Sequence, residues 1–311
     1  MIQKGDTIGI PRALLYHKYF VLWDAFLGSL GYKTVLSPET NVQILKDGVK
    51  IAVDESCLAV KIYLGHVNYL KDKVQHILVP RLASTYKKEQ NCARYMGLYD
   101  IVSNSFDNID ILDYNVDEVF GISEHDGLIE LGTKLCGNKR KARTAYLEAK
   151  RAYEEHGKKL VEEQNKILES ESELKILIFS HPYTIYDGLV GKPITKFLEK
   201  EGVSVLYSDR FDFAEAHKKG GEVSPSLHWT YLKEYLGAIA IAEGKIDGII
   251  YAISFPCGAD ALVVDVAQRK FSNISSIILT IDELQAETGL ITRLESFIDI
   301  LRFKKKQNES R

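Results

Sequence analysis

Short apolar segments alternate with longer amphipathic segments along the whole chain. The short segments are rich in β-branched residues, which is typical of buried strands, and the longer ones repeat apolar residues every three or four positions, which is typical of helices. Strands that alternate with helices indicate parallel sheets with right-handed crossovers. The expected strands are 7–11, 33–37, 76–80, 175–180, 203–209, 247–255 and 275–281, and the segment 110–116 ends the first unit. The expected helices are 13–30, 41–53, 58–73, 139–172, 192–202, 228–244, 258–270 and 288–303.

The pattern of the first half is echoed in the second. In each half a strand is followed by a loop, a helix, a glycine (Gly31 or Gly202) and another strand. Glycine after the last turn is a common helix C-cap. The echo favours two tandem flavodoxin-like domains, arising either by duplication or from the generic βαβ pattern.

The predicted fold is therefore α/β, with two tandem flavodoxin- or Rossmann-like parallel-sheet domains joined by a long helix. Residues 139–172 are rich in charge and carry only a sparse apolar stripe, which favours a long solvated helix. We predict an N-terminal α/β domain at 1–117, a helical linker at 118–172 and a C-terminal α/β domain at 173–311.

Composition limits the classes of partner. The 311 residues include 40 basic and 43 acidic side chains, a net charge of −3 that gives no electrostatic case for nucleic acid or a membrane surface. The N-terminal segment lacks the apolar core of a signal peptide, and no apolar run approaches the roughly 18 residues of a membrane span. We expect a cytoplasmic protein with no nucleic-acid or membrane partner, whose four cysteines are thiols or metal ligands.

Several common catalytic signatures are absent from the sequence. No GxGxxG follows a strand, the GKP at 191–193 lacks the Walker glycines, and neither HExxH nor GxSxG occurs. A nicotinamide-dinucleotide fold is therefore unsupported, and any ATP chemistry is expected to belong to a partner.

Three of the four cysteines lie beside predicted helix starts or strand ends, namely Cys57, Cys92 and Cys257. Thiolates are soft metal ligands, and α/β proteins assemble their sites at the carboxyl edges of parallel sheets. Three convergent thiolates would hold an iron–sulfur cluster with one iron open for chemistry. Ordinary buried thiols are the alternative, because the spacing contains no CxxC. Cys136 precedes Gly137 near a helix end and is expected to be an isolated thiol, although as a fourth ligand it would close the cluster.

Other candidate side chains follow predicted strands. His181 and Tyr183 come directly after strand 175–180, where a histidine could supply a proton to a leaving hydroxyl or a reduced product. The alternative is a hydrogen-bonded loop histidine beside packing aromatics. Arg12 and His17 follow the first strand, where they could contact a phosphate or coenzyme A. Arg81 could balance the charge of a cluster or form a surface ion pair.

Longer motifs resemble the 2-hydroxyacyl-CoA dehydratase superfamily, above all its acyl-CoA dehydratase activase-related members. The resemblance covers nearly the whole chain and is carried by IGIPRALLYHKYFVLWDAFLGSLGYKTVLSPETN, AVDESCLAVKIYLGHV, ILVPRL, HPYTIYDGLVGKPI, FPCGADALV and IDELQAETGLITRLESFIDIL. The sequence departs from the family at Ala59 and Ala93, where proline is frequent, and at DELQAETG, where the family often reads like DEHTGEAG.

The resemblance implies Rossmann-like domains that hold a [4Fe–4S] cluster between them, with Cys57, Cys92 and Cys257 as its ligands. In the dehydratases the open iron binds the substrate's thioester carbonyl or hydroxyl. An ATP-hydrolysing activase supplies an electron, and a ketyl radical of the substrate expels the hydroxyl group. Four cysteines cannot supply a double cubane, so a single cubane is favoured.

The expected function is therefore that of an oxygen-sensitive lyase of the 2-hydroxyacyl-CoA dehydratase type, or of a related low-potential reductase. The expected partners are an ATP-dependent activase, an acyl-CoA substrate, and a second homologous subunit or another copy of the chain. One alternative is a non-catalytic electron relay or scaffold that serves an activase. The other is a metal-free homologue whose cysteines are simply buried.

Overall fold

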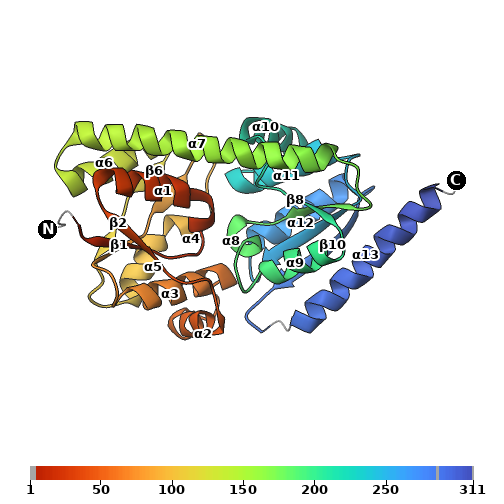
Figure 1. The fold of residues 1–311 in the computed structure, drawn as a ribbon, viewed down its shortest axis with the longest axis horizontal. Coiled ribbons are helices and arrows are strands. Elements are labelled where there is room, and N and C mark those ends of the chain that lie inside the picture. The colour runs from red at the N-terminus through yellow and green to blue at the C-terminus, as the bar shows by residue number, and fades with distance from the viewer. Residues whose placement is uncertain (1–4, 285–286, 310–311) are drawn as a thin grey trace. The chain divides into compact units, whose positions relative to one another are not determined.

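The computed structural model describes residues 5–284 and 287–309, and the chain divides into two compact units. Unit 1 is Met1–Gly157 with His228–Thr230, and unit 2 is Lys158–Leu227 with Tyr231–Arg311. Each unit has its own four-stranded parallel sheet, and in the described ranges no strand pairing joins the two sheets (Figure 1). The prediction of two tandem parallel-sheet α/β domains joined by a long helix is confirmed.

Unit 1 is built on a sheet in the order β2-β1-β3-β5, which β4 and β6 extend as a parallel pair beyond β3 and β5. The strands are β1 (Thr7–Ile10), β2 (Lys33–Leu36), β3 (His76–Leu78), β4 (Arg81–Ser84), β5 (Ile111–Leu112) and β6 (Asn115–Asp117). The helices that begin and end in this unit are α1 (Tyr16–Leu30), α2 (Val42–Ile51), α3 (Leu58–Leu70), α4 (Ala93–Met96), α5 (Leu98–Ser105) and α6 (Glu124–Cys136).

Unit 2 is built on a sheet in the order β10-β9-β7-β8. Its strands are β7 (Lys175–Phe179), β8 (Ser204–Tyr207), β9 (Gly248–Ser254) and β10 (Ser275–Ile281). Its helices are α8 (Pro182–Ile185), α9 (Lys192–Lys200), α10 (Phe213–Val223), α11 (Thr230–Ala242), α12 (Gly258–Lys270) and α13 (Glu287–Glu309). Strand β9 is buried along its whole length, as its unbroken apolar run requires in a sheet covered on both faces.

The two sheets have the same topology. When the strands of each four-stranded sheet are numbered along the chain, both sheets have the order 2-1-3-4. The first and third strands also share their register, because Ile8 pairs with His76 and Ile176 pairs with Gly248, the first residue of the third strand in each case. In such sheets the order reverses between the first and third strands, and ligands bind at the carboxyl ends of the strands near that point.

Most predicted elements lie within a few residues of the observed ones, but β4 and the helices α4, α5, α6, α8 and α10 are additional. The longest of these are α6 and α10. Both begin with a side-chain cap: Ser123 accepts a hydrogen bond from the Asp126 N–H, and Asp212 accepts one from the Glu215 N–H. Such caps mark a helix start, but a prediction based on the spacing of apolar residues does not include them. Helix α1 starts three residues later than predicted, after a turn in which Leu14 has a φ of 49°.

Helices α2 and α3 approach each other closely at two glycines. A Cβ atom on Gly48 would lie 1.8 Å from the Lys61 carbonyl oxygen, and one on Gly65 would lie 2.0 Å from the Ile44 carbonyl oxygen. Both oxygens are backbone atoms that cannot rotate away. The crossing therefore requires glycine on each helix.

Unit 2 repeats this crossing between α10 and α11. A Cβ atom on Gly220 would lie 1.9 Å from the Lys233 carbonyl oxygen, and one on Gly237 would lie 1.7 Å from the Ala216 carbonyl oxygen. The glycine spacing is the same in both pairs, and a lysine precedes the second glycine by four residues in each. A generic βαβ pattern does not require such detail, so the repeat favours duplication.

In each unit, a buried serine after the second strand accepts a backbone hydrogen bond from the segment that follows the first strand. Ser37 Oγ accepts a hydrogen bond from the Arg12 N–H at 2.8 Å, and Ser208 Oγ accepts one from the Ser180 N–H at 3.3 Å. Both serines are fully buried. The four residues occupy matching places in the two registers, which extends the repeat to the carboxyl edge of each sheet.

Helix α7 (Lys139–Glu169) is the predicted long helix, and the division between the units falls within it. In unit 1 it buries small side chains such as Ala145 and Ala149. In unit 2 its Gln164 carboxamide donates to the Tyr207 carbonyl at 2.9 Å and accepts from the Tyr207 N–H at 2.8 Å. The carboxamide thus satisfies backbone groups on the edge strand β8, as a neighbouring strand would.

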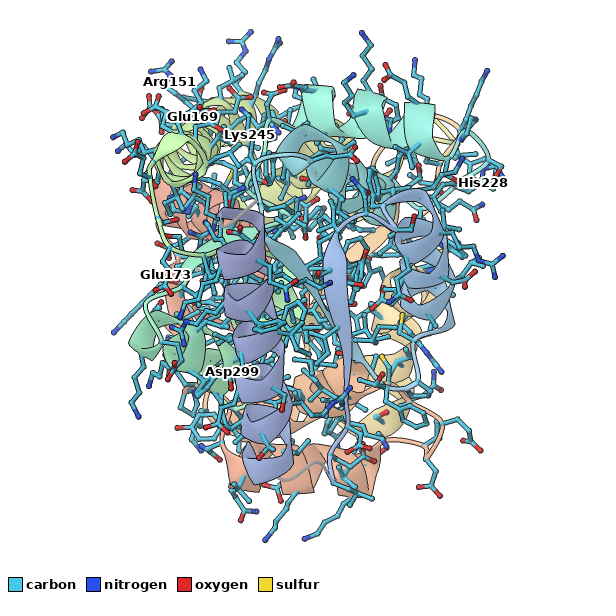
Figure 2. The ribbon with its side chains drawn as sticks, turned by 90° about the vertical axis from the view of Figure 1, so that its right-hand side faces the viewer. Arg151, Glu169, Glu173, His228, Lys245 and Asp299 are labelled. Carbon is cyan, nitrogen blue, oxygen red and sulfur yellow. The ribbon has the colours of Figure 1, made fainter. Side chains whose placement is uncertain are left out.

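In unit 2, ion pairs link side chains near the amino ends of β7 and β9. Lys245 Nζ lies 2.7 Å from Glu169 Oε1 at the end of α7, and Figure 2 labels both residues. Arg302 on α13 pairs with Glu173 at 3.3 Å. Throughout the described ranges, every helix is either too short or too polar to cross a lipid bilayer.

The glycine crossing can be tested with two adjacent glycines of α10. Gly220→Ala should destabilise the protein by about 1–3 kcal/mol or more, because the new methyl group meets the Lys233 backbone. Gly221→Ala is the matched control, since a Cβ there meets nothing within 4 Å and alanine favours the helix by ~0.5–1 kcal/mol. Urea unfolding should therefore move the two midpoints in opposite directions. Equal midpoints would contradict the close approach.

Candidate functional site

In unit 1, a hydrogen-bonded network lies at the carboxyl ends of β1 and β2. The Arg12 N–H donates to Ser37 Oγ, which lies 2.8 Å from His66 Nδ1 on α3. The other ring nitrogen, Nε2, lies 2.9 Å from Thr40 Oγ1. Both ring nitrogens of this fully buried histidine therefore have partners, and the loops after both strands are tied to α3.

His66 is uncharged in this network. Burial is the largest cause that lowers the pKa of His66 to about 3, and the nearby His17 and Arg12 contribute to the same lowering. With a neutral ring, one ring nitrogen donates a hydrogen bond and the other accepts one. Arg12, which follows β1, and His17, the second residue of α1, both influence His66, a histidine that was not among the predicted residues.

Cys57 and Cys92 both lie in unit 1 and both precede helices. Cys57 directly precedes α3, and because α3 leads into the amino end of β3, its first turn lies at the carboxyl edge of the sheet. Cys92 precedes α4, and its Sγ accepts a hydrogen bond from the Arg94 N–H at 3.4 Å. Neither thiol forms a disulfide within the described residues, and both are half-buried.

A three-residue segment of the second half, His228–Thr230, belongs to unit 1 and lies beside the loop that leads to Cys92. The Gln90 N–H donates to the His228 carbonyl at 2.8 Å, and the Thr230 N–H donates to the Gln90 carbonyl at 3.4 Å. The polar stretch before Cys92 is therefore held by parallel backbone pairing.

In unit 2, His181 and Cys257 follow the first and third strands, where the strand order reverses. His181 Nε2 lies 3.0 Å from Asp260 Oδ1, and this carboxylate is almost fully buried. The backbone N–H of the same Asp260 donates to Cys257 Sγ at 3.5 Å. The imidazole, the carboxylate and the thiol thus form one connected group at the start of α12.

Aromatic rings hold the His181 imidazole from two sides. Tyr183 stacks on it with ring centres 4.8 Å apart, and Tyr235 meets it edge-on at 5.2 Å. The two predicted side chains His181 and Tyr183 are therefore adjacent. Asp260 was missed, although it is an acidic residue three positions after a helix-start cysteine, where a carboxylate commonly occurs.

Cys136 has a different environment from the other three cysteines. It is the last residue of α6, and its Sγ donates to the Asn138 carbonyl at 3.4 Å. Here the sulfur acts as a donor, which requires the protonated thiol. Arg81 forms an ion pair with Asp100 at 3.0 Å, as in the surface-pair alternative.

The part of the chain that the structure describes contains no ready-made metal site. No group of three or more His, Cys, Asp or Glu side chains there could hold a metal ion. Cys57 and Cys92 belong to unit 1, and Cys257 belongs to unit 2. The convergence of the three thiols stays a prediction.

Comparison with protein families assigns the chain. The family described as "CoA enzyme activase uncharacterised domain (DUF2229)" matches residues 7–211, well over half of the sequence. The chain belongs to this family. The matched range contains Cys57, Cys92, His181 and Tyr183, whereas Cys257 lies beyond its end. Membership in a CoA enzyme activase domain family agrees with the predicted association with acyl-CoA dehydratase activases at that coarser level.

Other comparisons add little to the family assignment. No curated protein is significantly similar to the chain. A solved structure titled "Crystal structure of ZnuA" matches 93% of this chain and 98% of its own, with 9% sequence identity and a TM-score of 0.28. At that TM-score the likeness carries no information about fold or function.

The contrast between the cysteines predicts a difference in reactivity. On metal-free, reduced protein at neutral pH, Cys257 should be alkylated by iodoacetamide about two- to fivefold faster than Cys136. The helix start stabilises the Cys257 thiolate, whereas the Cys136 sulfur donates its proton to a carbonyl. Peptide mass spectrometry over a time course measures both rates in one sample. Faster labelling of Cys136 would contradict this reading.

Proposed function

We propose that the protein is an iron–sulfur protein of the 2-hydroxyacyl-CoA dehydratase type, in which Cys57, Cys92 and Cys257 hold a [4Fe–4S] cluster. The observation that carries the proposal is that these three cysteines each precede a helix, and two of their sulfurs accept backbone N–H groups. Such donors stabilise a thiolate and are typical of cluster ligands. The donor chemistry therefore fits the cluster.

When bound, such a cluster would supply a low-potential electron and an open iron position for reductive dehydration or a related reduction. The contribution of the chain is a positioned acid. Because the Asp260 carboxylate accepts from Nε2–H, His181 would hold or release a proton at Nδ1. The stacked Tyr183 would keep the ring in one orientation.

The proposed partners follow from what the chain lacks and from its family. An ATP-dependent activase would supply the electron, since no Walker motif is present in the sequence. An acyl-CoA is the proposed substrate, and a second homologous subunit or another copy of this chain would complete the assembly. Membership in a CoA enzyme activase domain family supports an association with this system.

Iron analysis tests the proposal directly. Protein purified without oxygen should contain about four iron and four sulfide per chain. Cys57→Ser, Cys92→Ser and Cys257→Ser should each lose most of both. Cys136→Ser is the matched control and should retain iron and sulfide. Cys136 is the last residue of α6, whereas the other three cysteines each precede a helix. Wild-type protein without iron, or equal loss in all four variants, would overturn the ligand assignment.

A second test asks whether the His181–Asp260 pair acts in turnover. With activase, ATP, a reductant and a panel of 2-hydroxyacyl-CoA substrates, Asp260→Asn should lower kcat by about 10²-fold with little change in KM or iron content. Asp265→Asn is the control, since Asp265 lies on the same helix but is exposed and pairs with Arg269 at 3.0 Å. If the activase rapidly reduces the cluster but no substrate turns over, the protein is an electron relay.

A further inference from the structure

Arg12, directly after β1, has a buried nitrogen with no partner. Among the described residues, its side-chain Nε makes no hydrogen bond although it is shielded from solvent. The nearest carboxylate is Glu39, whose Oε1 lies 3.9 Å from Arg12 Nη1, beyond hydrogen-bond distance. Although 28% of the Arg12 side chain is exposed, the buried Nε–H has no acceptor, which is unfavourable for a polar group shielded from water.

The surroundings of Arg12 favour a negative charge. Burial, the largest cause of the lowered pKa of His66, marks a poorly solvated region, and the charge of Arg12 contributes to the same lowering. Ser37 and Thr40 satisfy both nitrogens of the His66 ring. This network therefore offers Arg12 no acceptor for its side chain.

The position and conformation of the loop are those of a ligand site. It follows the first strand of a sheet with the order 2-1-3-4, at the edge where such folds bind ligands. Within it, Leu14 has a φ of 49°, a conformation that a bulky residue rarely adopts and that is common at ligand-binding loops. The guanidinium lies over the Tyr16 ring, 5.8 Å from its centre, which orients its planar fork.

We propose that Arg12 and the loop at 11–15 form a binding site for an oxyanion, a phosphate or carboxylate group of a small molecule. The guanidinium fork matches both groups with paired hydrogen bonds. The site lies wholly within unit 1 and needs no iron–sulfur cluster. The oxyanion proposal can therefore fail without contradicting the proposed function, and the reverse also holds.

Calorimetric titration of the full-length protein tests the site. Inorganic phosphate, acetate and coenzyme A are titrated separately, with chloride at matched ionic strength as the blank. At least one probe should bind, and the pattern among the three identifies the source of the oxyanion. Arg12→Met should weaken that binding by about tenfold or more. Arg81→Met is the matched control, because Arg81 also lies over a tyrosine, Tyr99, but already pairs with Asp100.

Two further variants keep the test decisive if Arg12→Met does not fold. Arg12→Lys keeps the charge but loses the fork, and it should weaken binding severalfold. Glu39→Gln removes the nearby carboxylate and should tighten binding by about two- to fivefold, because the half-exposed Glu39 opposes an incoming anion. Absence of binding by all three probes, or unchanged affinity in both Arg12 variants, would overturn the proposal. Weaker binding in Glu39→Gln would also contradict it.

Discussion

The close crossing of two glycine-bearing helices is the constraint on which each unit depends. In unit 1, Gly48 and Gly65 let α2 and α3 meet backbone to backbone, at distances that no Cβ atom could tolerate. This contact fixes α3 beside the sheet, and α3 in turn carries His66 and begins directly after Cys57. The position of the candidate thiol therefore depends on glycines that have no chemistry of their own.

The two units keep this framework and differ in the side chains placed on it. Ser37 and Ser208 fasten the same strand ends, but only the first also contacts a histidine. One residue after the second crossing glycine, unit 1 has His66 and unit 2 has the buried Ala238. Without that histidine, Ser208 returns its hydrogen bond to the Ser180 carbonyl at 3.3 Å. A repeated backbone thus supports ionisable groups in one unit and a neutral contact in the other.

The sequence predicted the architecture well because its signals are local. Strand runs, the helix ends at Gly31 and Gly202, and the placement of Cys57 and Cys257 before helices all follow from neighbouring residues. The site was only partly predictable, because its partners lie far apart along the chain. Asp260 is 79 residues from His181, and His66 is 29 residues from Ser37. Apolar periodicity cannot report such pairs.

Asp260 links two of the candidate groups through different atoms. Its backbone N–H faces the Cys257 sulfur, and its carboxylate faces His181. The first contact depends on the path of the backbone at the start of α12, and the second depends on the side chain. A change of side chain can therefore disturb the imidazole and leave the sulfur contact in place. The two roles are separable at a single residue because a helix start exposes its N–H groups while its third side chain turns back toward the preceding strand.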